Sequence, residues 1–444
     1  MHTNLMLSCL VAGTMTASAS NRPNIVVILT DDQGYADISY NAHHPEEVAT
    51  PHMDALAREG VFFSQAYISG NVCSPTRAGL MLGQYQHRVG VYDGGTGGSG
   101  FDPTIPIFPA MLPDAYFAGA FGKWHLGLDD DYPELKWHPL SRGFDSFYGF
   151  MGRGAHDYFD LLSDSTGKFK HPIYSDKQRV DDEGYLTTRL SEEAVEFIEK
   201  RHEGPFFVYL AYNAVHAPAQ APEADIKRYR AKYPHLTEKR AILMAMLEHL
   251  DNGIGDVLSA LRRTDTFDDT LLFFFTDNGG AGAMEANNAP LRGMKQEVYE
   301  GGHRTPFVVS WPDRFQGGRV VDTPIISLDV LPTVLDALGQ LETDNDFDGK
   351  SLLPLIEGKT ETHHPNFFWS EGGSTGEWAV RSGDFKLLGF KQRRELYNLA
   401  HDPAESKNLI DDQPAKAREI ESLYDRWLDQ MAPPASGDPK RFGD

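Results

Sequence analysis

The sequence predicts an α/β fold, with a large, mostly parallel sheet sandwiched by helices and a smaller C-terminal α+β domain built on a short antiparallel sheet. First, short buried apolar runs alternate with amphipathic helical segments along most of the chain, which is typical of a parallel sheet covered on both faces. Second, the sequence pattern changes after about residue 361, where short predicted strands with turns precede one final helix. We therefore expect a leader at residues 1–19, a main α/β domain at 20–360 and a C-terminal subdomain at 361–444.

Four stretches of the main domain are predicted to be buried strands, because they are continuous apolar runs that are too short for typical helices. They cover residues 24–29, 206–212, 270–275 and 306–310. Polar side chains directly follow the first three runs. In an open α/β sheet, sites form beyond the carboxyl ends of the strands, so we expect these polar side chains to belong to one site.

Amphipathic spacing and helix end signals predict the helices. They are expected at residues 51–59, 73–82, 186–200, 237–262, 330–338 and, in the C-terminal subdomain, 415–431. Thr50 and Gly60 suit the two ends of the first helix. In the second, Pro75 suits the first turn and Gly83 the C-terminal end. Cys73 is thereby expected at or just before a helix N-terminus, where backbone N–H groups create a positive field.

Two glycine-rich segments are predicted to be irregular. Residues 92–100 contain a formal match to the dinucleotide-binding glycine pattern, but prolines follow where that pattern requires a helix. We therefore reject a nucleotide site and expect a mobile loop near the mouth of the functional site. Residues 142–157 are rich in glycine and aromatic side chains, and we expect them to form a loop with substrate contacts.

The composition excludes several classes of partner. With 64 acidic and 41 basic residues, the chain has a formal net charge of −23, which argues against binding to nucleic acid or to anionic membranes. No apolar run reaches the roughly 18 residues that span a bilayer. We therefore expect neither a nucleic-acid partner nor insertion into a membrane.

The N-terminus resembles a secretory signal peptide, because an apolar stretch at residues 5–13 runs into Ala17-Ser18-Ala19. A disordered N-terminus is the alternative, since no Lys or Arg precedes the apolar stretch. Removal of the leader would also remove Cys9 and leave Cys73 as the only cysteine. Because the sequence also lacks an Asn-x-Ser/Thr acceptor, we expect a bacterial periplasmic or secreted protein.

Oxygen-bearing side chains follow two of the predicted strands. Asp31 and Asp32 come after the first, and Asp277 and Asn278 come after the third. Such ligands suit Ca²⁺ or Mg²⁺ rather than zinc or copper. Each pair alone could be an ordinary turn, but their shared position at strand ends favours one common metal site.

The other candidate residues are individually weak signals. Lys123 and His125 alternate in a glycine-rich segment, while His216 and Lys295 lie in expected loops. An isolated histidine is more often structural, and a lone cysteine such as Cys73 is more often part of the core. The adjacent histidines at 43–44 and 363–364 have no complementary residues in the sequence, so we assign them no function.

Several motifs together resemble the type I sulfatases of the alkaline phosphatase-like superfamily. Cys73-Ser74-Pro75-Thr76-Arg77 with the following Ala78 to Gly83 resembles their first signature, and Gly122-Lys123-Trp124-His125 resembles the second. The pairs at 31–32 and 276–279 and the segment 300–306 also match, so the resemblance covers residues 24–408. Two places depart from the pattern. The segment before Gly122 is short, which is expected to alter a helix, and His303 replaces an aliphatic residue, which is expected to change substrate contacts.

The resemblance implies a catalytic scheme. A maturation enzyme would oxidise Cys73 to Cα-formylglycine, whose hydrate supplies the nucleophile and can release sulfate by returning to the aldehyde. The ligands of the divalent ion, expected to be Ca²⁺, would be Asp31, Asp32, Asp277, Asn278 and the modified Cys73. In this scheme Arg77 orients the nucleophile, Lys123 and Lys295 neutralise the sulfate oxygens, His216 protonates the leaving alcohol, and His125 accepts a proton for sulfate release.

The expected substrate is a sulfated poly- or oligosaccharide. From the same resemblance, its contacts are expected at His156, Asp157, His303 and Arg304. Two alternatives remain open at this stage. One is a phosphonate monoester or phosphodiester hydrolase of the same superfamily, and the other is a non-catalytic protein that binds sulfated glycans.

Overall fold

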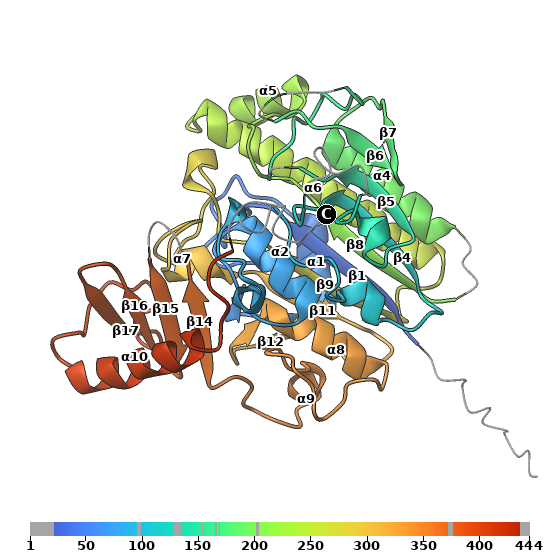
Figure 1. The fold of residues 1–444 in the computed structure, drawn as a ribbon. Helices are drawn as coiled ribbons and strands as arrows, with labels where there is room; N and C mark the ends of the chain where they lie inside the picture. The colour runs from blue at the N-terminus through green and yellow to red at the C-terminus, as the bar shows by residue number, and fades with distance from the viewer. Residues whose placement is uncertain are drawn as a thin grey trace, which may run out of the picture.

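The computed structural model describes residues 22–95, 99–127, 135–152, 154–164, 167, 169–200, 204–371 and 376–435. The expected leader at 1–19 and Cys9 lie outside the described residues. Figure 1 shows a main α/β domain with a smaller C-terminal lobe, drawn in red, on one side of it. No helix among the described residues is long and apolar enough to cross a membrane.

The main sheet has ten strands within the described part of the chain, in the order β12-β2-β11-β9-β1-β8-β4-β5-β6-β7. They are β1 (Asn24–Thr30), β2 (Val61–Phe63), β4 (Phe117–Lys123), β5 (Ser146–Phe150), β6 (Ile173–Ser175), β7 (Gln178–Val180), β8 (Phe206–Ala211), β9 (Thr270–Thr276), β11 (Phe307–Ser310) and β12 (Arg319–Val321). The central strands from β9 to β5 are parallel. Antiparallel pairs flank this centre at β11 on one side and at β6 and β7 on the other. The predicted fold class is confirmed.

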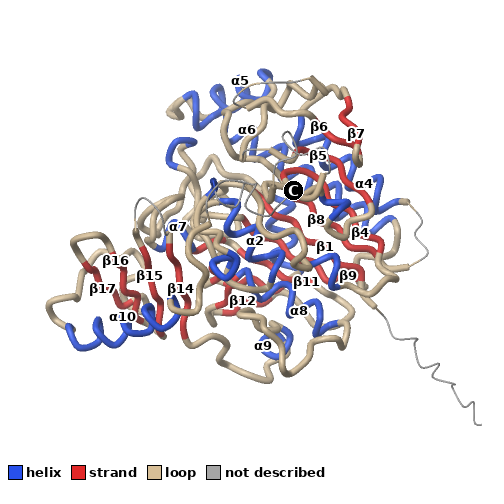
Figure 2. Tube along the Cα trace, in the orientation of Figure 1, coloured by secondary structure: helices blue, strands red, loops and turns tan. Residues whose placement is uncertain are grey.

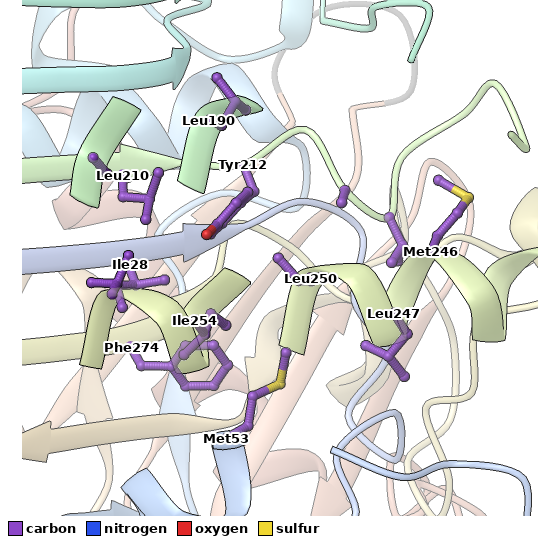
Figure 3. Packing of buried hydrophobic residues seen from close by; sticks show 14 of the residues in the cluster. Ile28, Met53, Leu190, Leu210, Tyr212, Met246, Leu247, Leu250, Ile254 and Phe274 are labelled. Atoms are coloured by element: carbon purple, nitrogen blue, oxygen red, sulfur yellow. The ribbon is translucent and has the colours of Figure 1, made fainter. Parts of the chain in front are cut away.

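The central strands are continuous apolar runs because both faces of the sheet are covered. All seven residues of β1 are buried, with Val26 and Ile28 packing into one core and Val27 and Leu29 into the other. Figure 3 shows Ile28 in the first core, together with Leu250 and Ile254 of the long helix Glu238–Arg263. The second core lies on the opposite face of the sheet.

The predicted helices are confirmed, with ends that differ from the predicted ones by at most three residues. They are α1 (Pro51–Glu59), α2 (Cys73–Leu82), α4 (Leu186–Glu199), α6 (Glu238–Arg263), α8 (Val330–Ala337) and α10 (Pro414–Leu428). Helices α1, α4 and α6 cover one face of the sheet, and α2 and α8 cover the other. Shorter helical segments are α5 (Glu223–Lys232), α7 (Glu300–His303), α9 (Leu353–Ile356) and the 3₁₀ turns Gln86–Val89, Phe108–Met111, Pro139–Ser141, Gly282–Met284 and Ser327–Asp329.

Two central strands were not predicted. The segment ending at Lys123 is β4, where an altered helix was expected, and β5 lies within residues 142–157, which were expected to be irregular. Both strands contain glycines, and because glycine has a low strand propensity, the sequence pattern did not indicate strands there. The tight packing requires these glycines, since a Cβ on Gly122 would lie 2.1 Å from the Ala211 carbonyl oxygen of β8.

The C-terminal lobe is an antiparallel sheet covered by one helix, as predicted. Its strands are β14 (Asn366–Ser370), β15 (Trp378–Ser382), β16 (Phe385–Gly389) and β17 (Arg394–Asn398), paired in sequence order. Trp378 of this sheet stacks on Tyr424 of α10. Figure 2 shows these strands beside the main domain, separate from its sheet. A small sheet of β3 (Ala66–Tyr67), β10 (Arg304–Thr305) and β13 (Ile325–Ile326) completes the described strands. The domain boundary at residue 360 stays a prediction.

Candidate active site

The predicted metal ligands and basic residues meet at the carboxyl ends of the central parallel strands. Strands β1 and β9 pair in register up to Thr30 opposite Thr276. The Asp277 N–H donates to the Thr30 carbonyl oxygen at 3.0 Å, so Asp31 and Asp277 leave neighbouring strands at the same level. Lys123, at the end of β4, also reaches this point. The parallel topology therefore assembles residues that are far apart in the sequence.

Each of these two carboxylates has one oxygen bound by a basic side chain. Arg77 binds Asp277, and Lys123 binds Asp31. Arg77 donates to Asp277 Oδ2 from Nε at 3.0 Å and from Nη2 at 2.7 Å. Lys123 Nζ donates to Asp31 Oδ2 at 2.5 Å. The other oxygens, Asp31 Oδ1 and Asp277 Oδ1, are buried and have no hydrogen-bond partner among the described residues. Because an unpaired buried acceptor lowers the stability of the folded protein, we expect each of these oxygens to bind a ligand.

Asp32 and Asn278 form the adjoining half of the cluster. Asp32 Oδ1 accepts hydrogen bonds from Lys295 Nζ at 2.5 Å and from Asn278 Nδ2 at 2.7 Å. Asp32 Oδ2 lies 3.6 Å from His216 Nε2. The amide of Asn278 is thus oriented with its nitrogen toward Asp32, and its buried Oδ1 has no partner in the described part of the chain.

The three unpartnered oxygens fit a hard divalent cation. They belong to two carboxylates and one amide, the oxygen ligands that Ca²⁺ and Mg²⁺ take in proteins. Possible ligand atoms of Asp31, Asp277 and Cys73 also lie within 4.8 Å of one another. Orphaned buried acceptors beside a cysteine are therefore the observation that supports the predicted metal site.

The pKa shifts of two aspartates reflect the same arrangement. Burial raises the pKa of Asp277, and Asp31 raises it further, against the attraction of Arg77. Burial also raises the pKa of Asp32, but Lys295 and His216 together outweigh it and the pKa lies below its usual value. A divalent cation beside Asp277 would favour the ionised carboxylate.

Cys73 is the first residue of α2 and lies at the cavity, with 5% of its surface exposed. The predicted helix end at Gly83 is confirmed, because Gly83 adopts a left-handed φ of 64° and its N–H bonds back to Gly79. Ser74, the next residue, donates to the His125 carbonyl oxygen at 2.7 Å. This contact, which the sequence did not predict, fixes the His125 segment to the start of the helix.

The two predicted catalytic histidines line the same cavity as Cys73. His125 is buried with a left-handed φ of 56°, and its Nδ1 has no partner among the described residues. Burial, with added repulsion from Lys123 and Arg77, holds its pKa far below the usual value. His216 is more exposed, and its Nδ1 donates to the Ala217 carbonyl oxygen at 2.8 Å, which leaves Nε2 for the cavity.

The cavity has a volume of about 1050 Å³. Gly94 and Gly95 of the glycine-rich segment line it, in agreement with the expected loop near its mouth. A wall that the sequence did not predict comes from the segment 164–179. It contains Asp164, Gly167, Phe169, Lys170, His171, Pro172 and Arg179. No periodicity or motif marks these residues, so the sequence offered no signal for them.

The four residues expected to contact substrate do not line this cavity. His156 is buried and its Nε2 bonds to the His171 carbonyl oxygen at 2.7 Å, while Asp157 accepts from the N–H groups of two following residues. His303 stacks on Trp369 with ring centroids 4.5 Å apart. Arg304 donates to the Ser64 carbonyl oxygen at 2.8 Å. The substrate contacts of these four residues stay predictions, and His303 packs against the C-terminal lobe.

Comparisons with known families agree with this arrangement. Residues 23–340 match the family described as Sulfatase. Residues 294–432 match the family described as N-sulphoglucosamine sulphohydrolase, C-terminal. The second match includes the C-terminal sheet and the segment that carries Lys295.

Individual relatives are similar over most of the chain. An uncharacterized sulfatase, YdeN, of Escherichia coli (strain K12) is 27% identical, over 94% of this chain and 88% of its own. The N-acetylgalactosamine-6-sulfatase of Canis lupus familiaris is 31% identical, over 86% of this chain and 74% of its own. The crystal structure of Ps i-CgsB in complex with k-i-k-neocarrahexaose is 32% identical with a TM-score of 0.85, covering 93% of this chain and 94% of that one.

Proposed function

The chain belongs to the sulfatase family, and from this premise we propose that it hydrolyses sulfate esters of a carbohydrate through a formylglycine made from Cys73 and a divalent cation. One observation carries the proposal. Asp31, Asp277 and Asn278 each carry a buried oxygen without a hydrogen-bond partner among the described residues, and these side chains form a cluster with Cys73, Lys123 and Lys295. Such a site combines cation ligands, a modifiable side chain and positive charges for an anionic substrate.

The cation ligands proposed are Asp31, Asp32, Asp277 and Asn278, with the modified residue 73 as a further ligand. A bound Ca²⁺ or Mg²⁺ ion would supply Lewis-acid polarisation of a sulfate oxygen. Formylglycine at residue 73 would supply, as its hydrate, a hydroxyl nucleophile. Arg77 contributes by fixing Asp277 and, through Nη1, the Lys123 carbonyl oxygen at 3.0 Å, so the end of β4 and the start of α2 are held together.

The lysines and histidines divide the remaining work. Lys123 and Lys295 hold ammonium groups at the two halves of the cluster, where they can stabilise charge on sulfate oxygens, an effect worth about 3 kcal/mol per donor. His216 presents Nε2 to the cavity and is placed to protonate the leaving alcohol. His125, whose low pKa keeps it neutral near pH 7, is placed to accept a proton.

A sulfated oligosaccharide is the substrate class that we propose. The cavity of about 1050 Å³ is large enough for several sugar rings. The relatives support the same class, since one is named for N-acetylgalactosamine 6-sulfate and another was solved with a neocarrahexaose. A periplasmic or secreted location after removal of residues 1–19, and maturation by a formylglycine-generating enzyme, complete the proposal.

The test has two readouts on the same preparation. Mass analysis of the mature protein should show residue 73 as the aldehyde, and ion chromatography should show free sulfate released from a panel of sulfated oligosaccharides. No sulfate from any class, with the aldehyde present at residue 73, would overturn the proposal. Faster hydrolysis of an aryl phosphonate than of the matching aryl sulfate would replace it with phosphonate monoester hydrolysis.

A further inference from the structure

The turn that carries His216 is held between two parts of the chain. Residues 213–216 come shortly after β8, and the His216 N–H closes the turn by donating to the Asn213 carbonyl oxygen at 2.8 Å. On one side of the turn, the Val215 N–H donates to the Asp31 carbonyl oxygen at 2.7 Å. This side is thus fixed to the end of β1, beside the proposed cation ligands.

Tyr158 holds the other side of this turn. Its hydroxyl oxygen lies 2.8 Å from the His216 carbonyl oxygen and 2.9 Å from the Asn213 carbonyl oxygen, and its single proton is shared between these two acceptors. Tyr158 is completely buried and is not among the described residues that line the cavity. One buried hydroxyl therefore bridges the first and last residues of the turn without reaching the cavity itself.

The segment around Tyr158 is also fixed to the chain that follows His216. The Tyr158 N–H donates to Gln220 Oε1 at 2.9 Å, and Gln220 Nε2 donates to Asp157 Oδ2 at 2.9 Å. The ring of Tyr158 stacks on that of Tyr185 with centroids 5.4 Å apart, and the Tyr185 hydroxyl donates to the Gln220 carbonyl oxygen at 2.9 Å. Tyr158 therefore has a fixed position from which to hold the turn.

From these contacts we propose that Tyr158 is a positioning residue, which places His216 for protonation of the leaving alcohol. The inference rests on the proposed function, in which protonated His216 passes its Nε2 proton to the alcohol oxygen as the S–O bond breaks and that oxygen takes the bonding electrons. The contact of His216 Nδ1 with the Ala217 carbonyl oxygen orients the ring, and Tyr158 fixes the backbone that carries it. A displacement of about 1 Å in such a group can lower a rate about a hundredfold.

The experiment compares Tyr158→Phe with a matched control, Tyr116→Phe. Tyr116 is also buried and its hydroxyl donates to the Pro23 carbonyl oxygen at 2.6 Å, but it lies just before β4, at the opposite end of that strand from Lys123. The substrates are a sulfated oligosaccharide that the wild type hydrolyses and 4-nitrophenyl sulfate. A sugar alcohol needs a proton to leave, whereas 4-nitrophenolate is stable without one, so the first reaction depends far more on a general acid.

Tyr158→Phe should lower kcat on the oligosaccharide by roughly tenfold to a hundredfold, with little change in KM. The loss on 4-nitrophenyl sulfate should be at least about fivefold smaller, and Tyr116→Phe should leave the ratio of the two rates unchanged. Because both rates come from one preparation, this ratio does not depend on the fraction of folded enzyme. If Tyr158→Phe does not fold, Gln220→Ala, which removes the acceptor of the Tyr158 N–H, is measured in its place. An unchanged ratio would overturn the inference, while sulfate release by the wild type still upholds the proposed function.

A second comparison introduces Tyr158→Phe into His216→Ala. The added substitution should lower the oligosaccharide rate by less than about twofold, because the group that Tyr158 positions is already absent. A purely structural role for Tyr158 would instead lower the rate by the same factor with and without His216. Equal losses in the two backgrounds would therefore also overturn the inference.

Discussion

Two buried carboxylate clusters of this protein differ in whether every carboxylate oxygen has a hydrogen-bond partner within the described residues. Asp329 lies at the start of α8, and each of its two carboxylate oxygens accepts two hydrogen bonds. Oδ1 accepts from the Lys350 N–H at 2.8 Å and from His364 Nε2 at 2.6 Å, and Oδ2 accepts from the Ile326 N–H at 2.9 Å and from His363 Nε2 at 3.1 Å. In the proposed catalytic cluster, Asp31 and Asp277 each keep one buried oxygen without a partner in the described residues.

The difference fits a structural role for the Asp329 cluster and the proposed catalytic role for the cluster of Asp31 and Asp277. Burial alone raises the pKa of both Asp329 and Asp277, but two histidines bring the pKa of Asp329 well below its usual value, while the pKa of Asp277 remains raised. A buried carboxylate whose acceptor positions are all filled stabilises the fold around it. One that is left incomplete is poised for a cation or a substrate.

The largest expected effect is the loss of activity in Asp277→Asn. The substitution removes the negative charge of a proposed ligand of the cation and the charged partner of Arg77. We therefore expect kcat/KM for sulfate release to fall by at least about 10³-fold. Sulfate release by the metal-reconstituted variant measures this loss. Retention of more than about a tenth of wild-type activity would mean that the unpartnered oxygen of Asp277 does not serve the reaction.

Asp329→Asn should give the opposite result, a loss of stability with retained chemistry. Its amide would place an N–H₂ group among four donors, and breaking such a buried charged network typically costs about 3–5 kcal/mol. Urea unfolding measures the loss, while kcat at 25 °C should stay within about twofold of wild type. Asp344→Asn, an exposed acid in the same region, is the control and should leave stability unchanged. Unchanged stability in Asp329→Asn would remove the contrast between the two clusters.

Cation binding provides a third, smaller difference between the clusters. Adding Ca²⁺ to chelator-treated protein should stabilise the wild type by about 2.7 kcal/mol at a concentration one hundred times Kd. Asp329→Asn should keep this increment and Asp277→Asn should lose most of it, as measured by thermal unfolding with and without Ca²⁺. An increment that disappears in Asp329→Asn instead would assign the cation to the histidine cluster.

The sequence predicted the parts of the catalytic cluster that depend on local pattern. The apolar runs before Asp31 and Asp277 identify buried strands, and parallel pairing brings their ends together. The sequence did not predict β4. Glycines in this strand allow neighbouring strands to pack closely, but glycine has a low strand propensity and so gives no strand signal. The sequence pattern also assigned no partner to His363 and His364, which is wrong, because both contact Asp329, which lies 34 and 35 residues earlier in the sequence. Such pairings depend on tertiary packing, and no local signal encodes them.

A third buried cluster lies between these two cases and joins the C-terminal sheet to α7. Glu405 accepts from the Glu300 N–H at 2.6 Å, and Lys386 Nζ lies 3.2 Å from Glu405 and 2.9 Å from Glu300. One ammonium thus lies between two carboxylates. Burial, reinforced by repulsion from Glu300 and opposed by Lys386, raises the pKa of Glu405 to about 7.

The raised pKa of Glu405 predicts a pH dependence of stability. The folded protein holds a proton on Glu405 that the unfolded chain releases near its usual pKa of 4.5. The stabilisation is therefore fully present below about pH 4.5 and is lost as the pH rises through about 7. Between about pH 5 and 7.5 the unfolding free energy of the wild type should fall by roughly 1–3 kcal/mol more than that of Glu405→Gln.

Urea unfolding at several pH values measures this difference, with Glu342→Gln as an exposed control. Only a titrating group changes the slope of the unfolding free energy against pH. A difference in unfolding free energy between wild type and Glu405→Gln that stays constant over the whole pH range would therefore reflect altered hydrogen bonding alone, and would mean that Glu405 stays ionised in the folded protein. In that case Lys386 would neutralise both carboxylates, and this cluster would be as complete as the one at Asp329.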